Sequence, residues 1–194
     1  MIKPNTECNE VINKSGCKRG LKKNKKNNCI GDSFRIVAIN CAGITSKLES
    51  FNKMLFDRKP SAWFLQETKR KINNPKMKAS NLINYQVFEL KREKSSREGG
   101  KGLNGGGLAV GALHALNPVL LRQGNDEVEC MTVEVTTGLT RLRCVIGYGP
   151  QLTDSPSRKE NFWKYLDKEI INAQEEGVGI IIEIDSNAWA GKGI

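Results

Sequence analysis

Residues 180–187 of the chain read Ile-Ile-Ile-Glu-Ile-Asp-Ser-Asn. Branched aliphatic residues pack well on a pleated surface that is covered on both faces, so the run of Ile predicts a buried β-strand. Asp185 and Asn187 are two residues apart and therefore point to the same side of an extended backbone. Such a pair suits a general base and an orienting hydrogen-bond donor at a strand end. The alternative is an Asx turn that closes the strand, which is the commoner use of these residues.

The chain before this strand alternates between strand and helix patterns. Apolar residues at helical spacing predict amphipathic helices over 47–58 and 157–175. Shorter apolar or alternating runs predict further strands at 34–39, 62–65, 85–90, 108–113, 128–135 and 141–147. The first helix joins two strands as in a βαβ unit, whereas residues 136–139 read as the turn of an antiparallel hairpin. The sequence therefore predicts an α/β or α+β fold with mixed sheets.

The composition is that of a globular protein with one domain. The 194 residues are 38% hydrophobic and 27% charged, and no apolar run approaches the ~18 residues that a membrane span requires. The first 33 residues lack the apolar segment of a secretory signal, so we expect six reduced thiols and an intracellular protein that is not secreted. The cysteine spacing does not suit zinc. We find no sign of a membrane or of a protein partner.

The net charge of +10 is concentrated toward the N-terminus. Residues 1–33 hold eight Lys or Arg and three Asp or Glu, which gives 8 − 3 = +5. Few apolar residues are present there, so we expect a disordered basic tail followed by a folded domain over 34–194. A basic balance fits a nucleic-acid partner, although improved solubility is an alternative. The candidates for contacts to nucleic acid, or for a nuclear address, are Lys22, Lys23, Lys25 and Lys26.

Polar residues that could carry chemistry occupy the ends of four predicted strands. They are Asn40, Glu67, Tyr148 and the pair Asp185 and Asn187. If these strands end at one sheet edge, the side chains converge to give carboxylates, amides and a phenol. Mg²⁺ is held in proteins by one or two carboxylates together with substrate phosphate oxygens. The set therefore predicts metal-assisted hydrolysis of a phosphate ester, with Asp185 activating water.

Four motifs in this order resemble the endonuclease/exonuclease/phosphatase superfamily, whose fold is deoxyribonuclease I-like. The first is an opening made of Asn40-Cys41-Ala42-Gly43 and Leu65-Gln66-Glu67-Thr68, and the second is a glycine-led strand at 105–110. The third is Tyr148-Gly149-Pro150, and the fourth is the signature Asp185-Ser186-Asn187. The Gln-Glu-Thr sequence and the glycine-led strand are most similar to the apurinic-endonuclease-like domains of non-LTR retrotransposons. The resemblance extends over 34–191.

The resemblance implies a two-sheet α/β sandwich and a role for each candidate. Glu67 would bind Mg²⁺ (or Mn²⁺) with Asn40 beside it, and Tyr148 would contact the scissile phosphate. Asp185 would be the base, and Asn187 would donate to the phosphate oxygens. The implied activity is hydrolysis of DNA by an endonuclease. A phosphatase of the same fold that acts on small phosphate esters, and a non-catalytic remnant that binds nucleic acid, remain alternatives.

The superfamily pattern continues with later strands, a second Asp and a final Asp-His pair. These would follow Ile194, so we expect the domain over 34–194 to be partial and incomplete at its C-terminal side. Without these residues the chain could be catalytically inactive.

Overall fold

The computed structural model describes residues 34–71, 73–91, 106–125 and 127–186, which all belong to one compact unit, Ser33–Ile194. The first half of the described chain contains β1 (Ile36–Asn40), α1 (Leu48–Arg58), β2 (Ala62–Gln66), β3 (Tyr85–Leu90) and β4 (Leu108–Leu113). The second half contains β5 (Val119–Gln123), β6 (Cys130–Thr137), β7 (Thr140–Tyr148), α2 (Pro156–Glu175) and β8 (Gly179–Asp185). Three short 3₁₀ helices are η1 (Thr45–Lys47), η2 (Ser80–Asn84) and η3 (His114–Leu116).

The strands form two four-stranded mixed sheets. The first sheet has the order β1-β2-β4-β3 and the second has the order β5-β6-β7-β8. Each sheet contains one parallel pair, β1 with β2 and β7 with β8, and its other pairs are antiparallel. The α/β sandwich that the sequence predicts is therefore confirmed.

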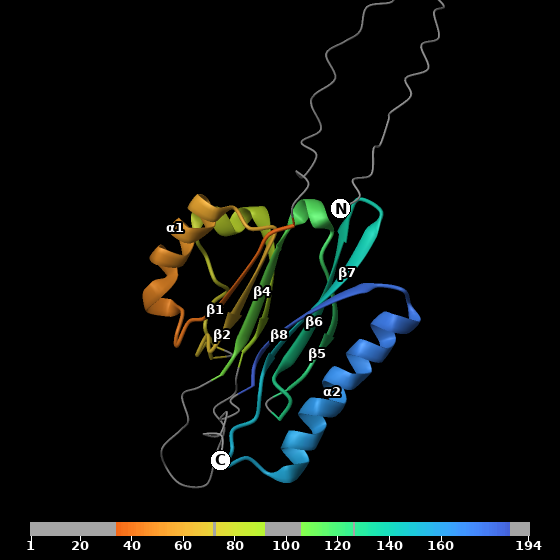
Figure 1. Ribbon diagram of the computed structural model, residues 1–194. Coiled ribbons are helices and arrows are strands. Elements are labelled where there is room, and N and C mark those ends of the chain that lie inside the picture. The colour runs from red at the N-terminus through yellow and green to blue at the C-terminus, as the bar shows by residue number, and fades with distance from the viewer. Residues whose placement is uncertain (1–33, 72, 92–105, 126, 187–194) are drawn as a thin grey trace, which may run out of the picture. The chain divides into compact units, whose positions relative to one another are not determined.

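The two sheets face each other across the main core. Phe64 and Val110 of the first sheet pack in one cluster with Met131 and Ile146 of the second. The outer face of the first sheet is covered by α1 and that of the second by α2, on opposite sides of the sandwich (Figure 1). Burial on both faces explains why strands such as β2, which is buried at all five residues, read as continuous apolar runs.

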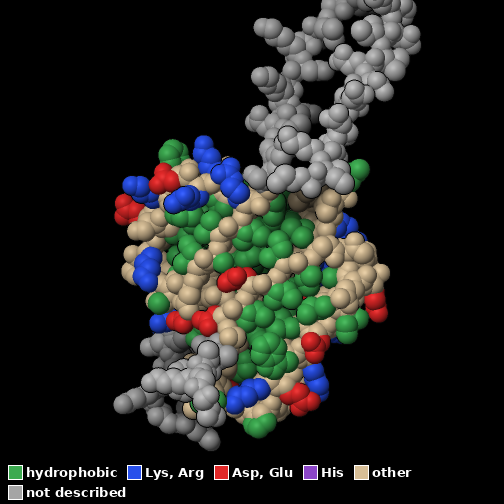
Figure 2. Space-filling model, viewed as in Figure 1, with side chains coloured by type: hydrophobic (Ala, Val, Ile, Leu, Met, Phe, Trp, Pro, Cys, Tyr) green, Lys and Arg blue, Asp and Glu red, His purple; other side chains and the backbone are tan. Residues whose placement is uncertain are grey.

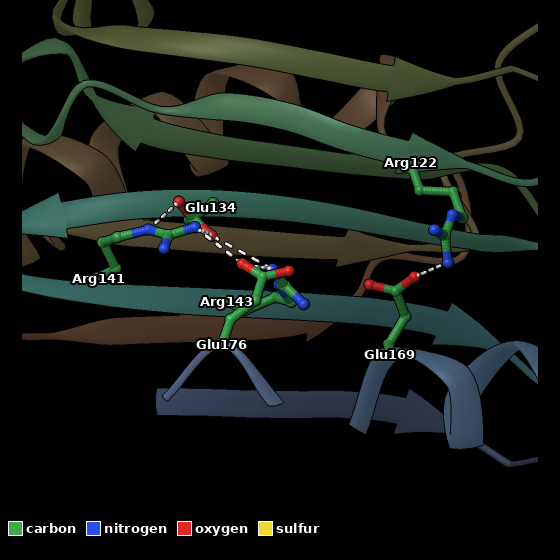
Figure 3. Close-up of polar contacts among 6 residues, drawn as sticks. All are labelled: Arg122, Glu134, Arg141, Arg143, Glu169 and Glu176. Atoms are coloured by element: carbon green, nitrogen blue, oxygen red, sulfur yellow. Dashed lines mark hydrogen bonds and ion pairs between the residues drawn. The ribbon is translucent and has the colours of Figure 1, made fainter. Parts of the chain in front are cut away.

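Ion pairs fasten α2 and the turn after it to the second sheet. Figure 3 shows Glu169 of α2 facing Arg122 of β5, and Glu176 facing Arg143 of β7. The distance from Arg143 Nη2 to Glu176 Oε2 is 2.9 Å. Glu169 and Arg143 are each only 2% exposed, so these charges depend on their partners.

The sequence analysis assigns no element to β5. Its exposure alternates, and the pairing with β6 shifts register between Leu120 and Arg122, which breaks the pattern that marks a strand. β5 is also an edge strand of the second sheet, where β8 forms the other edge among the described residues. Hydrophobic side chains are visible at the surface between the layers in Figure 2, and Ile182 of β8 is 37% exposed. No helix in the described part of the chain is long and apolar enough to cross a membrane.

Candidate active site

The candidate site lies where the parallel strands of both sheets end. Asn40 of β1 pairs in register with Gln66 of β2. Asn40 and Glu67, the residue after Gln66, therefore emerge at one edge of the first sheet. Tyr148 of β7 pairs with Asp185 of β8 at the edge of the second sheet. Buried Gln66 joins the two edges, because its Nε2 donates to the Gly147 carbonyl at 3.0 Å. The structure thus brings four of the predicted residues together.

Asn40 connects the two carboxylates of the site. Its Nδ2 donates to Glu67 Oε1 and to Asp185 Oδ2, both at 3.0 Å. Its Oδ1 accepts a hydrogen bond from the Ala42 backbone N–H at 3.1 Å. Because a backbone N–H can only donate, that bond assigns the orientation of the amide. The amide therefore aligns a carboxylate from each sheet, and the more distant of them, Asp185, is 145 residues away from Asn40 in the sequence.

Glu67 is held in a strained backbone conformation. Its φ of 51° lies in the left-handed region, which a residue with a side chain adopts at a free-energy cost unless its surroundings enforce it. The Glu67 carbonyl accepts from Gly43 N–H at 2.7 Å, and Thr68 N–H donates to the Gly107 carbonyl at 3.0 Å. A Cβ on Gly107 would lie 2.6 Å from Thr68 Oγ1, so only glycine allows this approach. The glycine-led strand thus fixes the loop that presents Glu67.

Tyr148 and Asp185 approach from the second sheet. The Tyr148 hydroxyl donates to Glu67 Oε1 at 3.2 Å, and the side chain is buried with 7% exposure. The Asp185 carbonyl accepts from Gly149 N–H at 2.7 Å. A Cβ on Gly149 would lie 2.7 Å from the Ser186 carbonyl oxygen, so the turn after Tyr148 needs glycine to pass so close to the end of β8.

The structure adds Lys69 and Glu129, which the sequence analysis missed. Lys69 Nζ lies 3.7 Å from Glu67 Oε2, and Lys69 also has a positive φ of 52°. Glu129 is 1% exposed; its Oε1 accepts from Gly107 N–H at 3.2 Å and its carbonyl accepts from Tyr148 N–H at 2.8 Å. Glu129 therefore supports Gly107 and Tyr148, which both lie next to Glu67 or its loop. A lysine two residues after the carboxylate was a usable signal, whereas Glu129 lies inside the predicted strand 128–135 and carried none.

Cys41 has a structural place beside the site. Its thiol donates to the Gln66 carbonyl at 3.0 Å. Burial is the main cause that raises the pKa of the Cys41 thiol, so it stays protonated near neutral pH. Cys41 therefore supports the backbone next to Glu67 and is no nucleophile.

The donor set fits a hard divalent cation better than zinc. Among the described residues no group of three or more His, Cys, Asp or Glu side chains could hold a metal. Glu67 and Asp185 accept hydrogen bonds from the same amide nitrogen of Asn40, so two carboxylates come together at the site. Carboxylate oxygens with substrate phosphate oxygens are ligands of hard divalent cations, whereas zinc is held mainly by nitrogen and sulfur.

Some predicted residues lie outside the described residues. These are Asn187, Lys22, Lys23, Lys25 and Lys26, whose roles stay predictions.

Solved structures share this fold. The human Nocturnin catalytic domain matches with a TM-score of 0.56 at 14% identity, over 82% of this chain and 65% of that one. A 3′-5′ exonuclease from Neisseria meningitidis matches with 0.55 at 17% identity, over 79% and 57%. The endonuclease domain of TRAS1, a telomere-specific non-LTR retrotransposon, matches with 0.52 at 16% identity, over 81% and 62%.

These structures share the two-sheet α/β sandwich of this chain, which is the deoxyribonuclease I-like fold that the sequence predicted. This chain spans only 57 to 65% of the length of the three matched chains. No protein-family model and no curated protein matches the sequence. The likeness therefore shows the fold, and the activity is argued from the site.

Proposed function

We propose that this protein is a divalent-metal-dependent phosphodiesterase that cuts DNA internally, an endonuclease of the retroelement type. The observation that carries the proposal is a convergence at strand ends of both sheets: Asn40 donates to Glu67 and to Asp185, and the Tyr148 hydroxyl donates to Glu67. Structures with this fold include one Neisseria enzyme described both as a 3′-5′ exonuclease and as a 3′ phosphatase bound to product DNA, and a retrotransposon endonuclease domain. The basic charge favours a polyanionic substrate.

Each residue has a defined task in this proposal. Glu67 would hold Mg²⁺ or Mn²⁺ with Asn40 beside it, and the ion would supply neutralisation of charge on the phosphate. Asp185 takes a proton from a water molecule while the oxygen of that water forms a bond to phosphorus. The bond between phosphorus and the leaving sugar oxygen breaks, and its electron pair stays on the sugar oxygen. Asn40 orients the Asp185 carboxylate for this step through the bond to Oδ2. Tyr148 contacts the scissile phosphate, and Asn187 donates to its oxygens.

Relaxation of supercoiled plasmid with Mg²⁺ tests the proposal. A closed circle has no ends, so any relaxed product requires an internal cut and excludes a purely exonucleolytic enzyme. Glu67→Gln keeps the size and the strained backbone but removes the charge, and should slow nicking at least about 10²-fold. Glu160→Gln, which changes an exposed carboxylate of α2, is the matched control and should nick normally.

Parallel substrates separate the alternatives. Release of phosphate from small phosphate esters, without plasmid nicking, would identify a phosphatase of the same fold. Binding of DNA with no turnover under Mg²⁺ or Mn²⁺ would identify a non-catalytic nucleic-acid-binding protein. Either result contradicts the endonuclease proposal.

A DNA substrate goes with an intracellular and nuclear site of action. Lys22, Lys23, Lys25 and Lys26 are the residues we propose as the nuclear address. A fluorescent fusion should lose nuclear enrichment when these four lysines become Gln. Unchanged enrichment would contradict the assignment.

A further inference from the structure

A basic loop, Lys69–Lys78, begins two residues after Glu67, and the structure describes all of it except residue 72. It contains Lys69, Arg70, Lys71, Lys76 and Lys78, and no acidic residue occurs between Glu67 and Glu89. Lys69, Lys71, Lys76 and Lys78 are exposed, whereas Arg70 is buried. Its exposed positive charge next to the candidate site suits a negatively charged partner.

The loop is held in place by its one buried cation. Arg70 Nε lies 2.6 Å from Glu89 Oε1, and both side chains are less than 10% exposed. Arg70 Nη2 also donates to the Pro75 carbonyl, and Lys91 Nζ donates to the Asn74 carbonyl at 2.7 Å. Met77 is buried in the cluster outside the first sheet. The four exposed lysines therefore belong to a fixed surface.

These anchors place the loop at the catalytic edge of the first sheet. Glu89 and Lys91 stand at the end of β3, where Leu90 pairs with Leu108, the residue after Gly107. Gly107 is in turn bonded to Thr68, next to Glu67. β3 is two strands away from β2, which is about 10 Å at normal strand spacing. That distance equals roughly three base pairs of duplex at 3.4 Å per phosphate along each strand.

One of the four exposed lysines, Lys76, also borders a groove between the sheets, together with Lys91 of the anchoring strand end. The groove has a volume of about 440 Å³ and is lined by Lys76, Met77, Val87, Glu89, Lys91 and Gln123. Gln123 ends β5 in the second sheet, so the groove continues the same edge that carries the candidate active site. Lys69, which is 3.7 Å from Glu67 Oε2, lies between the site and the rest of the basic loop.

We propose that the basic loop is a second contact surface for duplex DNA, which binds the phosphate backbone about three base pairs from the cleaved bond. The inference rests on the proposed function for the identity of the substrate. Surface lysines that neutralise phosphates release counterions, so they should set the salt dependence of binding. Because Lys71 and Lys76 are exposed and make no contact with the carboxylates of the site, changing them leaves the chemistry intact.

The test is fluorescence anisotropy with a short labelled duplex in EDTA, over a series of potassium chloride concentrations. Lys71→Gln with Lys76→Gln should lower the slope of log K against log salt by about 1.8, because each neutralised phosphate contributes roughly 0.9. Lys164→Gln with Lys168→Gln removes the same charge from exposed positions of α2 and should leave the slope unchanged. Thermal melts confirm that both variants are folded.

Equal slopes for the two double variants, or no binding by the parent chain, would overturn the inference. The result is separable from that of the proposed function because EDTA prevents cleavage. Loop-dependent binding without plasmid nicking would contradict the endonuclease alone. Nicking with no dependence of binding on the loop would contradict this inference alone.

Discussion

At the scale of single residues, Asn40 forms hydrogen bonds to three other residues of the site. Its Nδ2 contacts carboxylates from two different sheets while its Oδ1 is held by Ala42. Without the amide, Glu67 and Asp185 would face each other as like charges. Asn40 thus reduces the repulsion between these two carboxylates.

Asn40→Asp should make the stability of the protein depend on divalent cations. The change replaces a donor by a third carboxylate, so in EDTA the free energy of unfolding should fall by about 1 kcal/mol. Added Mg²⁺ neutralises the cluster and should raise the Tm of the variant more than that of the parent, as measured by scanning fluorimetry. An equal Mg²⁺ response in the two proteins would show that Asn40 does not face a cation site.

The sequence predicted Asn40, Glu67, Tyr148 and Asp185 because each follows an apolar strand, and the structure brings these four together. It could not predict Glu129, whose role depends on contacts to Gly107 and Tyr148 from distant parts of the chain. The left-handed backbone of Glu67 was equally hidden, because glutamate has no local preference for it.

At the scale of elements, α2 is fixed by charge as well as by its apolar face. Phe162 and Leu166 of α2 pack against the second sheet, and Glu169 of α2 forms an ion pair with Arg122 of β5. Arg122 is partly exposed whereas Glu169 is almost fully buried. The pair therefore connects the helix to an edge strand that has one neighbour in its sheet among the described residues.

Removing only the arginine should be costly. Arg122→Met leaves the Glu169 carboxylate buried without its cation, which should lower the free energy of unfolding by about 3 kcal/mol in urea denaturation. Adding Glu169→Met replaces the unpaired charge by an apolar side chain and should recover most of the loss. A single variant within about 0.5 kcal/mol of the parent would show that the pair does not hold α2.

Most elements followed from the apolar pattern, and the exception has a physical cause. The predicted strands 85–90 and 108–113 match β3 and β4 at both ends, and helix 157–175 differs from α2 by one residue. These elements have a face buried in a core, so their periodicity is strong. β5 was missed because an exposed edge strand with a register shift has weak periodicity.

At the scale of the whole molecule, the core between and behind the sheets contains thiols that cannot easily ionise. Cys144 lies between the two sheets and Cys130 lies under α2. Burial raises the pKa of Cys144 to about 12 and raises the pKa of Cys130 as well. In the unfolded chain both thiols return to values near 9.

Stability should therefore decrease in alkaline solution. The folded pKa is above the unfolded one, so this contribution is complete below pH 9 and is lost as the pH rises toward 12. At pH 10 one such thiol should cost about 1.4 kcal/mol relative to pH 7. Urea denaturation of Cys144→Ala should show a shallower decline with pH than the parent, and parallel curves would contradict the assignment.

The two sheets meet in one site because their parallel pairs end at the same edge. The account depends on the claim that this edge performs chemistry on phosphodiesters, with Asp185 as the base. The most direct measurement compares the time courses of plasmid nicking by the parent chain and by Asp185→Asn, at equal concentration in Mg²⁺. The account predicts relaxed circles with the parent and a rate lower by about 10²-fold or more with the variant. Equal rates, or no relaxed circles from the parent in either Mg²⁺ or Mn²⁺, would contradict it.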